Sequence, residues 1–221
     1  MGERQLAFSF QNPLRRGGVR SGAGRKPGVS HLRHTPHRAR PIHRKANPVH
    51  VTLRAELRFL RSQQVSRLLL GALRDSNRDW FRVVHYSVQD NHLHLIVEAD
   101  DTRTLSSGVR SLMVRMARRV NCKLRRRGRF WADRWHGRDL EGPRQVRNAL
   151  VYVLQNHRKH AGSTALDPLS SAGSFDGFAN PLPPTFRSVG PPCVAAAKTW
   201  LLRIGWRKRG LIQLSEAPAS R

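Results

Sequence analysis

The chain has 221 residues, which is enough for one medium domain with extensions and too few for two full domains. Its 41 Lys and Arg outnumber 14 Asp and Glu, and the formal net charge of +27 makes a polyanion such as nucleic acid the expected partner. No apolar run approaches the roughly 20 residues of a membrane span, and two distant cysteines exclude a disulfide framework or a zinc knuckle, so we expect a protein of the cytoplasm.

Residues 1–46 are rich in Arg, Gly, Pro and His and have few apolar side chains, which predicts a flexible basic arm. Within the arm, the stretch "SGAGRKPGVS" contains Gly-Arg-Lys-Pro-Gly around Arg25 and Lys26. This string resembles the core of an AT-hook, which binds in a narrow minor groove. The alternative is a basic tail that touches phosphates without specificity.

The first half of residues 47–162 alternates between strand and helix patterns. Val49, Val51 and Leu53 alternate with polar residues, which is typical of a half-buried strand. A helix is expected over residues 57–79, and residues 80–88 and 92–99 read as two strands of a hairpin joined by the turn 89–91. The apolar stripe expected on this helix consists of Leu57, Leu60, Gln64, Leu68 and Ala72.

The second half continues with a helix, a strand and a helix. A long helix is expected over residues 101–130, closed by Gly128, then a strand over 130–140 and a helix over 143–162 with Pro143 in its first turn. The apolar stripe of the long helix consists of Leu105, Val109, Leu112, Met116, Val120 and Leu124.

The order of these elements predicts an α+β fold of the ferredoxin-like, split βαβ type. Its antiparallel sheet would have four to five strands with helices packed on it. Residues 163–221 are expected to be a linker and a short helical extension, Val194–Gly210, which is either an appendage of the core or a second DNA contact.

Two histidines stand one residue apart in the expected strand 92–99. Side chains at positions i and i+2 of a strand share a face, so His92 and His94 can both reach one divalent ion. Imidazole suits Mn²⁺, Zn²⁺ or Ni²⁺, whereas sites that also hold a phosphate oxygen often take Mg²⁺ or Mn²⁺. On spacing alone, such paired strand histidines are more often partly exposed or hydrogen-bonded structural residues.

The helix over 143–162 carries a tyrosine on a polar flank. Tyr152 lies away from the apolar stripe, and Asn156 follows it by one turn on the same flank. One reading is a phenol that packs at the helix edge and leaves its hydroxyl in water. The other is a phenol held toward the sheet beside a carboxamide ligand.

These two segments together, "YSVQDNHLHLIVEA" and "ALVYVLQNHRKHAG", resemble the His-hydrophobic-His strand and the tyrosine helix of single-tyrosine HUH transposases. Within that group the resemblance is to the REP-associated tyrosine transposases. It covers residues 47–162 and includes the stretch "RGRFWADRWHGRDL" before the tyrosine helix. The resemblance implies cleavage and rejoining of hairpin-bearing single-stranded DNA with Mg²⁺ or Mn²⁺, in the nucleoid of a bacterium, by a monomer or a homodimer.

The resemblance also implies roles for individual residues. His92 and His94 match the metal-binding pair, and Tyr152 matches the nucleophile that forms a 5′-phosphotyrosine link and leaves a free 3′-hydroxyl. Asn156 stands where the family places a third, amide-type ligand, with His157 or His160 as alternatives. A phenol, with an ordinary pKa of about 10, needs activation at neutral pH.

A basic and aromatic stretch before the tyrosine helix is the expected binding track for single-stranded DNA. Arginines neutralise phosphates, and tryptophan rings stack on bases. The alternative is a solvated arginine run beside two core tryptophans. The residues expected to contact DNA are Arg125, Arg126, Arg127, Arg129, Trp131, Arg134 and Trp135.

Two other classes of function compete with a transposase. One is a catalytically inactive relative that only binds DNA. The other is an RNA-binding ferredoxin-like module, which should carry aromatic residues on its central strands where this chain has histidines. Tyr86, six residues before His92, is expected to be a packing residue and not a second nucleophile.

Overall fold

The computed structural model describes residues 41–161, 166–182 and 193–218, which all lie within one compact unit, His34–Arg221. Four strands form one sheet in the order β2-β3-β1-β4, and every neighbouring pair is antiparallel. The strands are β1 (Val49–Arg54), β2 (Phe81–Val88), β3 (His92–Ala99) and β4 (His136–Asp139). This strand order is that of a split βαβ unit, so the expected α+β, ferredoxin-like fold is confirmed.

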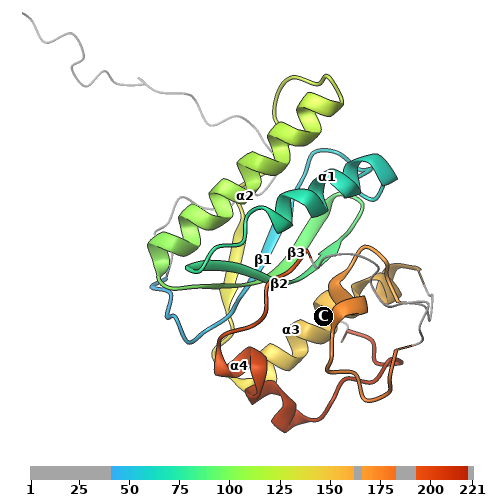
Figure 1. The fold of residues 1–221 in the computed structure, drawn as a ribbon. Helices are drawn as coiled ribbons and strands as arrows, with labels where there is room; N and C mark the ends of the chain where they lie inside the picture. Colours follow the sequence, from blue (N-terminus) through green and yellow to red (C-terminus); the bar gives the residue numbers. More distant parts are fainter. Residues whose placement is uncertain (1–40, 162–165, 183–192, 219–221) are drawn as a thin grey trace, which may run out of the picture. The chain divides into compact units, whose positions relative to one another are not determined.

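Helices cover both faces of this sheet (Figure 1). The helices α1 (Gln63–Arg74) and α2 (Thr102–Lys123) join β1 to β2 and β3 to β4, and both pack on one face. The helix α3 (Pro143–Ala161) packs on the other face with the C-terminal part of the chain. That part contains η1 (Ser171–Ser174), α4 (Trp200–Arg203) and η3 (Gly205–Arg209).

Alternation along the central strands separates the two hydrophobic clusters. Leu93 and Leu95 of β3 point into the cluster under α1 and α2, together with Val51 of β1. Ile96 points to the opposite face and packs in the cluster under α3. His94 has the parity of Ile96, so the histidine face of β3 is the face that α3 covers.

Strand β2 contains a β-bulge between Val83 and His85. Val83 and Tyr86 both lie in the cluster under α1 and α2, although they are three residues apart, while Val84 lies in the cluster under α3. One extra residue in a strand reverses the side-chain alternation beyond it, which explains this pattern.

Helix α2 follows its expected apolar stripe but ends early. Asp101 and Thr104 form a capping box at its start, and the stripe residues from Leu105 to Val120 are buried. The helix ends at Lys123 because Arg125 takes a left-handed conformation, with φ of 48°, before Gly128 is reached. No helix in the described part of the chain has the length and apolar composition that a membrane crossing needs.

The expected stripe of α1 is confirmed at Ala72, which is buried, and at Leu68, which packs against the core, but it is wrong at Gln64. The helix starts at Gln63, after Leu57 and Leu60, so these residues do not set its phase. Gln64 is exposed. The side chains that α1 buries are Val65, Ser66, Leu69, Ala72 and Leu73. Strand β4 is also shorter than expected, because residues 130–135 form only an isolated bridge, Trp131 with Ala55, before continuous pairing begins at His136.

Both ends of the described chain attach to the core more closely than the sequence indicates. The core begins before residue 47, because His43 is buried. Nδ1 of His43 lies 2.9 Å from Oδ2 of Asp139, and its Nε2 forms a hydrogen bond with the carbonyl of Ala99. At the other end, the backbone N–H groups of Lys198 and Thr199 donate to Glu98, a fully buried carboxylate of β3. Residues beyond 166 therefore form part of the cluster under α3.

Candidate active site

His94 stands at the centre of a polar cluster on the α3 face of the sheet. Strand pairing places it opposite Thr52 of β1, and its Nδ1 lies 3.2 Å from the hydroxyl of Thr52. The same Nδ1 lies 3.2 Å from Nε2 of His50, two residues earlier on β1. His94 is 5% exposed, so the surrounding fold fixes its ring.

Tyr152 comes to this cluster from α3. Its hydroxyl lies 3.4 Å from Nε2 of His94, and the two rings meet edge to face with centroids 4.9 Å apart. The ring of His50 lies 5.6 Å from that of Tyr152. Helix α3 packs on the sheet through Leu150 and Val153. Tyr152 is half-buried, beside the polar cluster around His94. The phenol and the His-x-His strand therefore meet, although they are separated by 58 residues.

His92 completes the histidine row at the start of β3. Its ring centroid lies 4.8 Å from that of His94, and its Nδ1 lies 2.8 Å from Oδ1 of Asn91. An amide oxygen only accepts hydrogen bonds, so Nδ1 of His92 donates. In the neutral ring the lone pair then resides on Nε2, which is the form that a metal ligand needs.

Asn156 is buried in an unusual state. Its side chain is 1% exposed, and no described residue hydrogen bonds either its oxygen or its nitrogen. A regular helix would put Asn156 on the flank of Tyr152, but α3 is broken between them at Gln155, with φ of −120° and ψ of 16°. Gln155 is itself buried and donates to the carbonyl of Gln213, 2.9 Å away. Of the alternatives to Asn156, His157 is half-buried, and the side chain of His160 lies outside the described residues.

The donor atoms of His92, His94 and Asn156 fit a divalent ion. Two imidazoles and an amide oxygen with no partner among the described residues suit a borderline or hard cation such as Mn²⁺ or Mg²⁺. The described residues contain no cluster of three or more His, Cys, Asp or Glu arranged to hold a metal. The candidate site differs from such a cluster because its third ligand would be an amide.

His50 was missed by sequence reasoning. It sits in the alternating pattern of β1 as one of the polar residues, and its parity with Thr52 places both on the α3 face. The expected split βαβ fold places β1 beside β3, so the parity of His50 in the first strand was the signal that could have found it. The packing role expected for Tyr86 is the one that it has, because its ring lies on the opposite face, where burial raises the pKa of its hydroxyl.

The basic stretch divides into exposed arginines and buried aromatic rings. Arg125, Arg127 and Arg134 are exposed. Glu56 forms ion pairs with two other arginines: its Oε2 lies 4.0 Å from Nη2 of Arg126, and its Oε1 lies 3.8 Å from Nε of Arg129. Free stacking by Trp131 and Trp135 does not fit the structure, because they are only 9% and 8% exposed. The core packs both rings, and Nε1 of Trp131 donates to the carbonyl of Met113. Arg25 and Lys26 lie outside the described residues.

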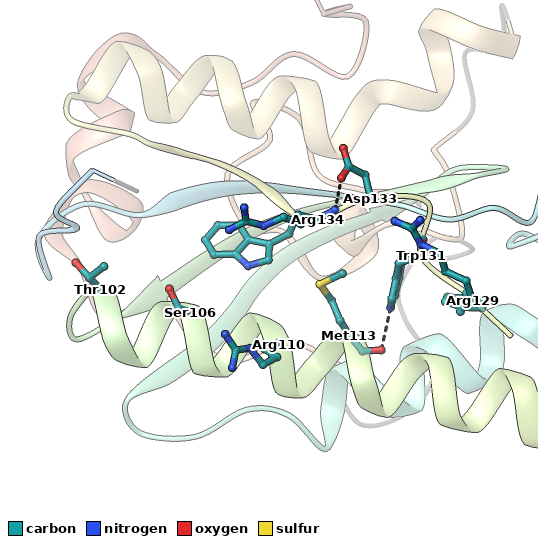
Figure 2. Close-up of a pocket in the computed structure, with 10 residues that line it drawn as sticks. Thr102, Ser106, Arg110, Met113, Arg129, Trp131, Asp133 and Arg134 are labelled. Carbon is teal, nitrogen blue, oxygen red and sulfur yellow. Dashed lines mark hydrogen bonds between the residues drawn. The ribbon is translucent and has the colours of Figure 1, made fainter. Parts of the chain in front are cut away.

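A groove lies between the first half of α2 and residues 129–135, with a volume of about 770 Å³ (Figure 2). We call it the α2 groove. Thr102, Ser106, Arg110 and Met113 project into it from one face of α2, and Arg129 and Arg134 approach from the opposite segment. Its other lining residues are Phe130, Trp131, Asp133 and Trp135.

Comparisons with solved structures find proteins of similar fold. The sheet order and the helices on its faces define an α+β domain of the ferredoxin-like type. A solved structure of a REP-associated tyrosine transposase bound to a REP hairpin is similar to this chain, with a TM-score of 0.51 and 19% sequence identity. The likeness covers 62% of this chain and 82% of that one. No model of a known protein family matches the chain, and no curated protein matches it.

Proposed function

We propose that the chain is a metal-dependent single-strand DNA transposase that cleaves and rejoins hairpin-bearing DNA through a 5′-phosphotyrosine intermediate. The observation that carries the proposal is the hydroxyl of Tyr152, 3.4 Å from Nε2 of His94 on the His-x-His strand. The similar structure is of a transposase bound to a DNA hairpin, and the net charge of +27 suits the same kind of partner. The proposal implies an enzyme of the bacterial cytoplasm that associates with the nucleoid.

The chemistry follows from a phenol beside a pair of imidazoles. The oxygen of Tyr152 attacks the scissile phosphorus, loses its proton, and forms a phosphotyrosine bond while the bond to O3′ breaks. The O3′ that leaves takes up a proton and becomes a free hydroxyl. When a 3′-hydroxyl attacks the phosphotyrosine, the steps reverse, and strands rejoin without an external energy source.

His92, His94 and Asn156 would hold Mg²⁺ or Mn²⁺, which when bound polarises the scissile phosphate and offsets the charge that develops on it. Within the chain, His50 and Thr52 contact Nδ1 of His94 and so fix the orientation of its ring. Helix α3 holds Tyr152 half-buried, with its oxygen on the Nε2 side of the same ring. The nucleophile is thus positioned by packing before any DNA binds.

The test is a covalent adduct. The full chain is incubated with a labelled single strand that contains a hairpin, in the presence of Mn²⁺ or Mg²⁺, and then denatured. We expect an adduct that migrates with the protein, its loss in Tyr152→Phe, and its retention in Tyr86→Phe, the matched control on the opposite face of the sheet. An adduct that survives in Tyr152→Phe would show that the nucleophile is another residue.

The inactive binding module makes a different prediction in the same assay. It would bind the hairpin with unchanged affinity in the wild type and in Tyr152→Phe and would form no adduct with either metal. Loss of the adduct in His92→Ala, with hairpin binding retained, would place His92 in the metal site and separate cleavage from binding.

A further inference from the structure

We propose that Asp167 is a positioning residue of the candidate site, because through Arg61 it holds the turn at residues 89–91 and with it His92. This inference rests on the proposed function and deepens it, since it assigns a supporting residue to the same site. Asp167 lies beyond residues 47–162, the part of the chain that resembles the transposases. The support would therefore come from this chain's own extension.

Asp167 and Arg61 form a bidentate ion pair that is largely shielded from water. Nη1 and Nη2 of Arg61 each donate to one carboxylate oxygen of Asp167, and both distances are 2.8 Å. The side chain of Asp167 is 1% exposed, and that of Arg61 is 23% exposed. Two parallel bonds fix the plane of the guanidinium group as well as its position, and salt screens such a pair only weakly.

The backbone of residues 167–170 holds the carboxylate in place. Oδ1 of Asp167 accepts from the backbone N–H of Leu169 at 2.9 Å. The carbonyl of Asp167 accepts from both the backbone N–H and the hydroxyl of Ser170. The carbonyl of Leu169 in turn accepts from the N–H of Val88, the last residue of β2. The carboxylate is therefore fixed relative to the end of β2.

The loop between β1 and α1 contacts the turn through three backbone carbonyls. Nη1 of Arg61 donates to the carbonyl of Val88 at 2.6 Å. Backbone N–H groups of the loop donate to the other two carbonyls: Leu60 to Asp90 at 3.0 Å, and Ala55 to Asn91 at 2.8 Å. Because the bond from Arg61 comes from a long side chain, its geometry depends on the anchor that Asp167 provides at the same guanidinium group.

The turn controls the position of His92. The carbonyl of His92 accepts from the N–H of Gln89 at 2.8 Å, and Oδ1 of Asn91 lies 2.8 Å from Nδ1 of the His92 ring. A shift of the turn would therefore move both the backbone and the ring of His92. Loss of the groups that orient a ligand histidine typically weakens metal binding by about 10- to 100-fold.

Amide hydrogen exchange of the metal-free protein tests whether Asp167 holds the turn. Asp167→Asn keeps the shape of the side chain and removes its charge. We expect three amides that bond across or to the turn to exchange about tenfold faster than in the wild type, because this region then opens locally. These amides belong to Ala55, Leu60 and Gln89. The amide of Leu140, which donates to Pro48 at the opposite end of β1, should keep its protection.

Mn²⁺ binding without DNA tests whether the turn matters to the site. The electron paramagnetic resonance signal of free Mn²⁺ measures the dissociation constant, which we expect to rise about tenfold in Asp167→Asn. The control is Asp75→Asn, which also removes a carboxylate that pairs with an arginine, Arg119. Asp75 caps the end of α1 that lies away from Arg61, so this variant should bind Mn²⁺ as the wild type does.

A double-mutant cycle shows whether Asp167 acts through the turn. Asn91→Ala removes the contact between the turn and the ring of His92. In this background, Asp167→Asn should weaken Mn²⁺ binding less than it does in the wild type. If Asp167→Asn does not fold, Arg61→Lys replaces it in every measurement, because lysine keeps the charge but cannot bond both carboxylate oxygens in parallel.

Three results would each overturn the proposal: unchanged exchange of the turn amides, an equal loss of protection at Leu140, or full additivity in the cycle. The proposed function fails separately. If the turn amides respond to Asp167→Asn but the wild type binds no Mn²⁺, or binds it and forms no covalent adduct with DNA, the proposed function is contradicted while Asp167 still holds the turn.

Discussion

Asn156 combines two properties that folded proteins rarely combine. Its amide is buried almost completely, and no described residue satisfies either of its polar atoms. A buried polar group without a partner costs about 1–3 kcal/mol of stability. Such a cost is expected where a residue is kept for a ligand and not for packing, which supports Asn156 as the third metal ligand over His157.

Asn156→Leu separates function from stability at this residue. The two side chains have similar shapes, and leucine removes the unsatisfied polar atoms, so the metal-free variant should unfold with a free energy about 1 kcal/mol or more above that of the wild type. Mn²⁺ at roughly a hundred times its dissociation constant should stabilise the wild type by about 2.7 kcal/mol and the variant far less. Urea unfolding with EDTA and with Mn²⁺ measures both effects.

The adjacent Gln155 provides the control for this prediction. Gln155→Met loses the hydrogen bond to the carbonyl of Gln213 and also removes Oε1, which has no partner among the described residues, but it leaves Asn156 in place, so it should keep the response of the wild type to Mn²⁺. If Asn156→Leu were destabilised in EDTA, or were stabilised by Mn²⁺ as much as the wild type, Asn156 would not be the ligand.

At the scale of elements, the periodicity of apolar residues predicted the features that depend on local sequence alone. The stripe of α2 and the parity of β3 follow from repeats of 3.6 and two residues, and the structure has both. The phase of α1 could not be predicted, because Leu57 and Leu60 precede its first turn at Gln63. The break of α3 at Gln155 coincides with a hydrogen bond to Gln213, a contact between distant residues that no window of sequence contains.

A close approach of α2 to β2 depends on Gly108. A Cβ atom at this position would lie 2.3 Å from the ring of Phe81, which is fully buried and cannot move aside. Gly108→Ala should therefore lower the free energy of unfolding by about 1–3 kcal/mol, although alanine favours helix by about 1 kcal/mol. Urea unfolding of the two proteins measures the difference.

Gly71 of α1 is the matched control for Gly108. Its nearest neighbour would be Nη1 of Arg119, at 3.2 Å, the end of a flexible side chain. Gly71→Ala should leave stability unchanged or raise it by up to about 1 kcal/mol, because the helix gains and the arginine can shift. Equal losses at both glycines would mean that contact with Phe81 is not the cause.

At the scale of the whole molecule, the C-terminal segment supports the helix that carries Tyr152. Leu201, Leu202 and Trp206 pack in the cluster under α3, and Arg147 of α3 pairs with Glu216 at 2.6 Å. The sequence predicted a helical extension over Val194–Gly210 and left open whether it is an appendage of the core or a DNA contact. Its packing partners on α3 lie about 50 residues earlier in the chain, so no local pattern could identify them. The domain that holds the candidate site thus extends beyond the expected boundary at residue 162.

Glu98 is the main polar anchor of this segment. The buried carboxylate pairs with the equally buried Arg82 at 3.1 Å and accepts from the backbone of Lys198 and Thr199. Glu98→Gln leaves Arg82 without its counter-charge and should cost about 3–5 kcal/mol. Trypsin should then cut the basic segment 198–209 faster than in the wild type. Glu56→Gln, at an exposed and weakly paired position, should leave the digestion rate unchanged.

The bulge in β2 has a consequence for the number of reactive groups. The chain has two tyrosines, and strand pairing sets Tyr86 beside Leu95, one residue from His94. If Val84 took a regular place in β2 and were not accommodated by the bulge, the alternation of the strand would turn the phenol of Tyr86 onto the same face as Tyr152. The bulge in this edge strand therefore leaves one tyrosine hydroxyl, and not two, on the face that carries His94.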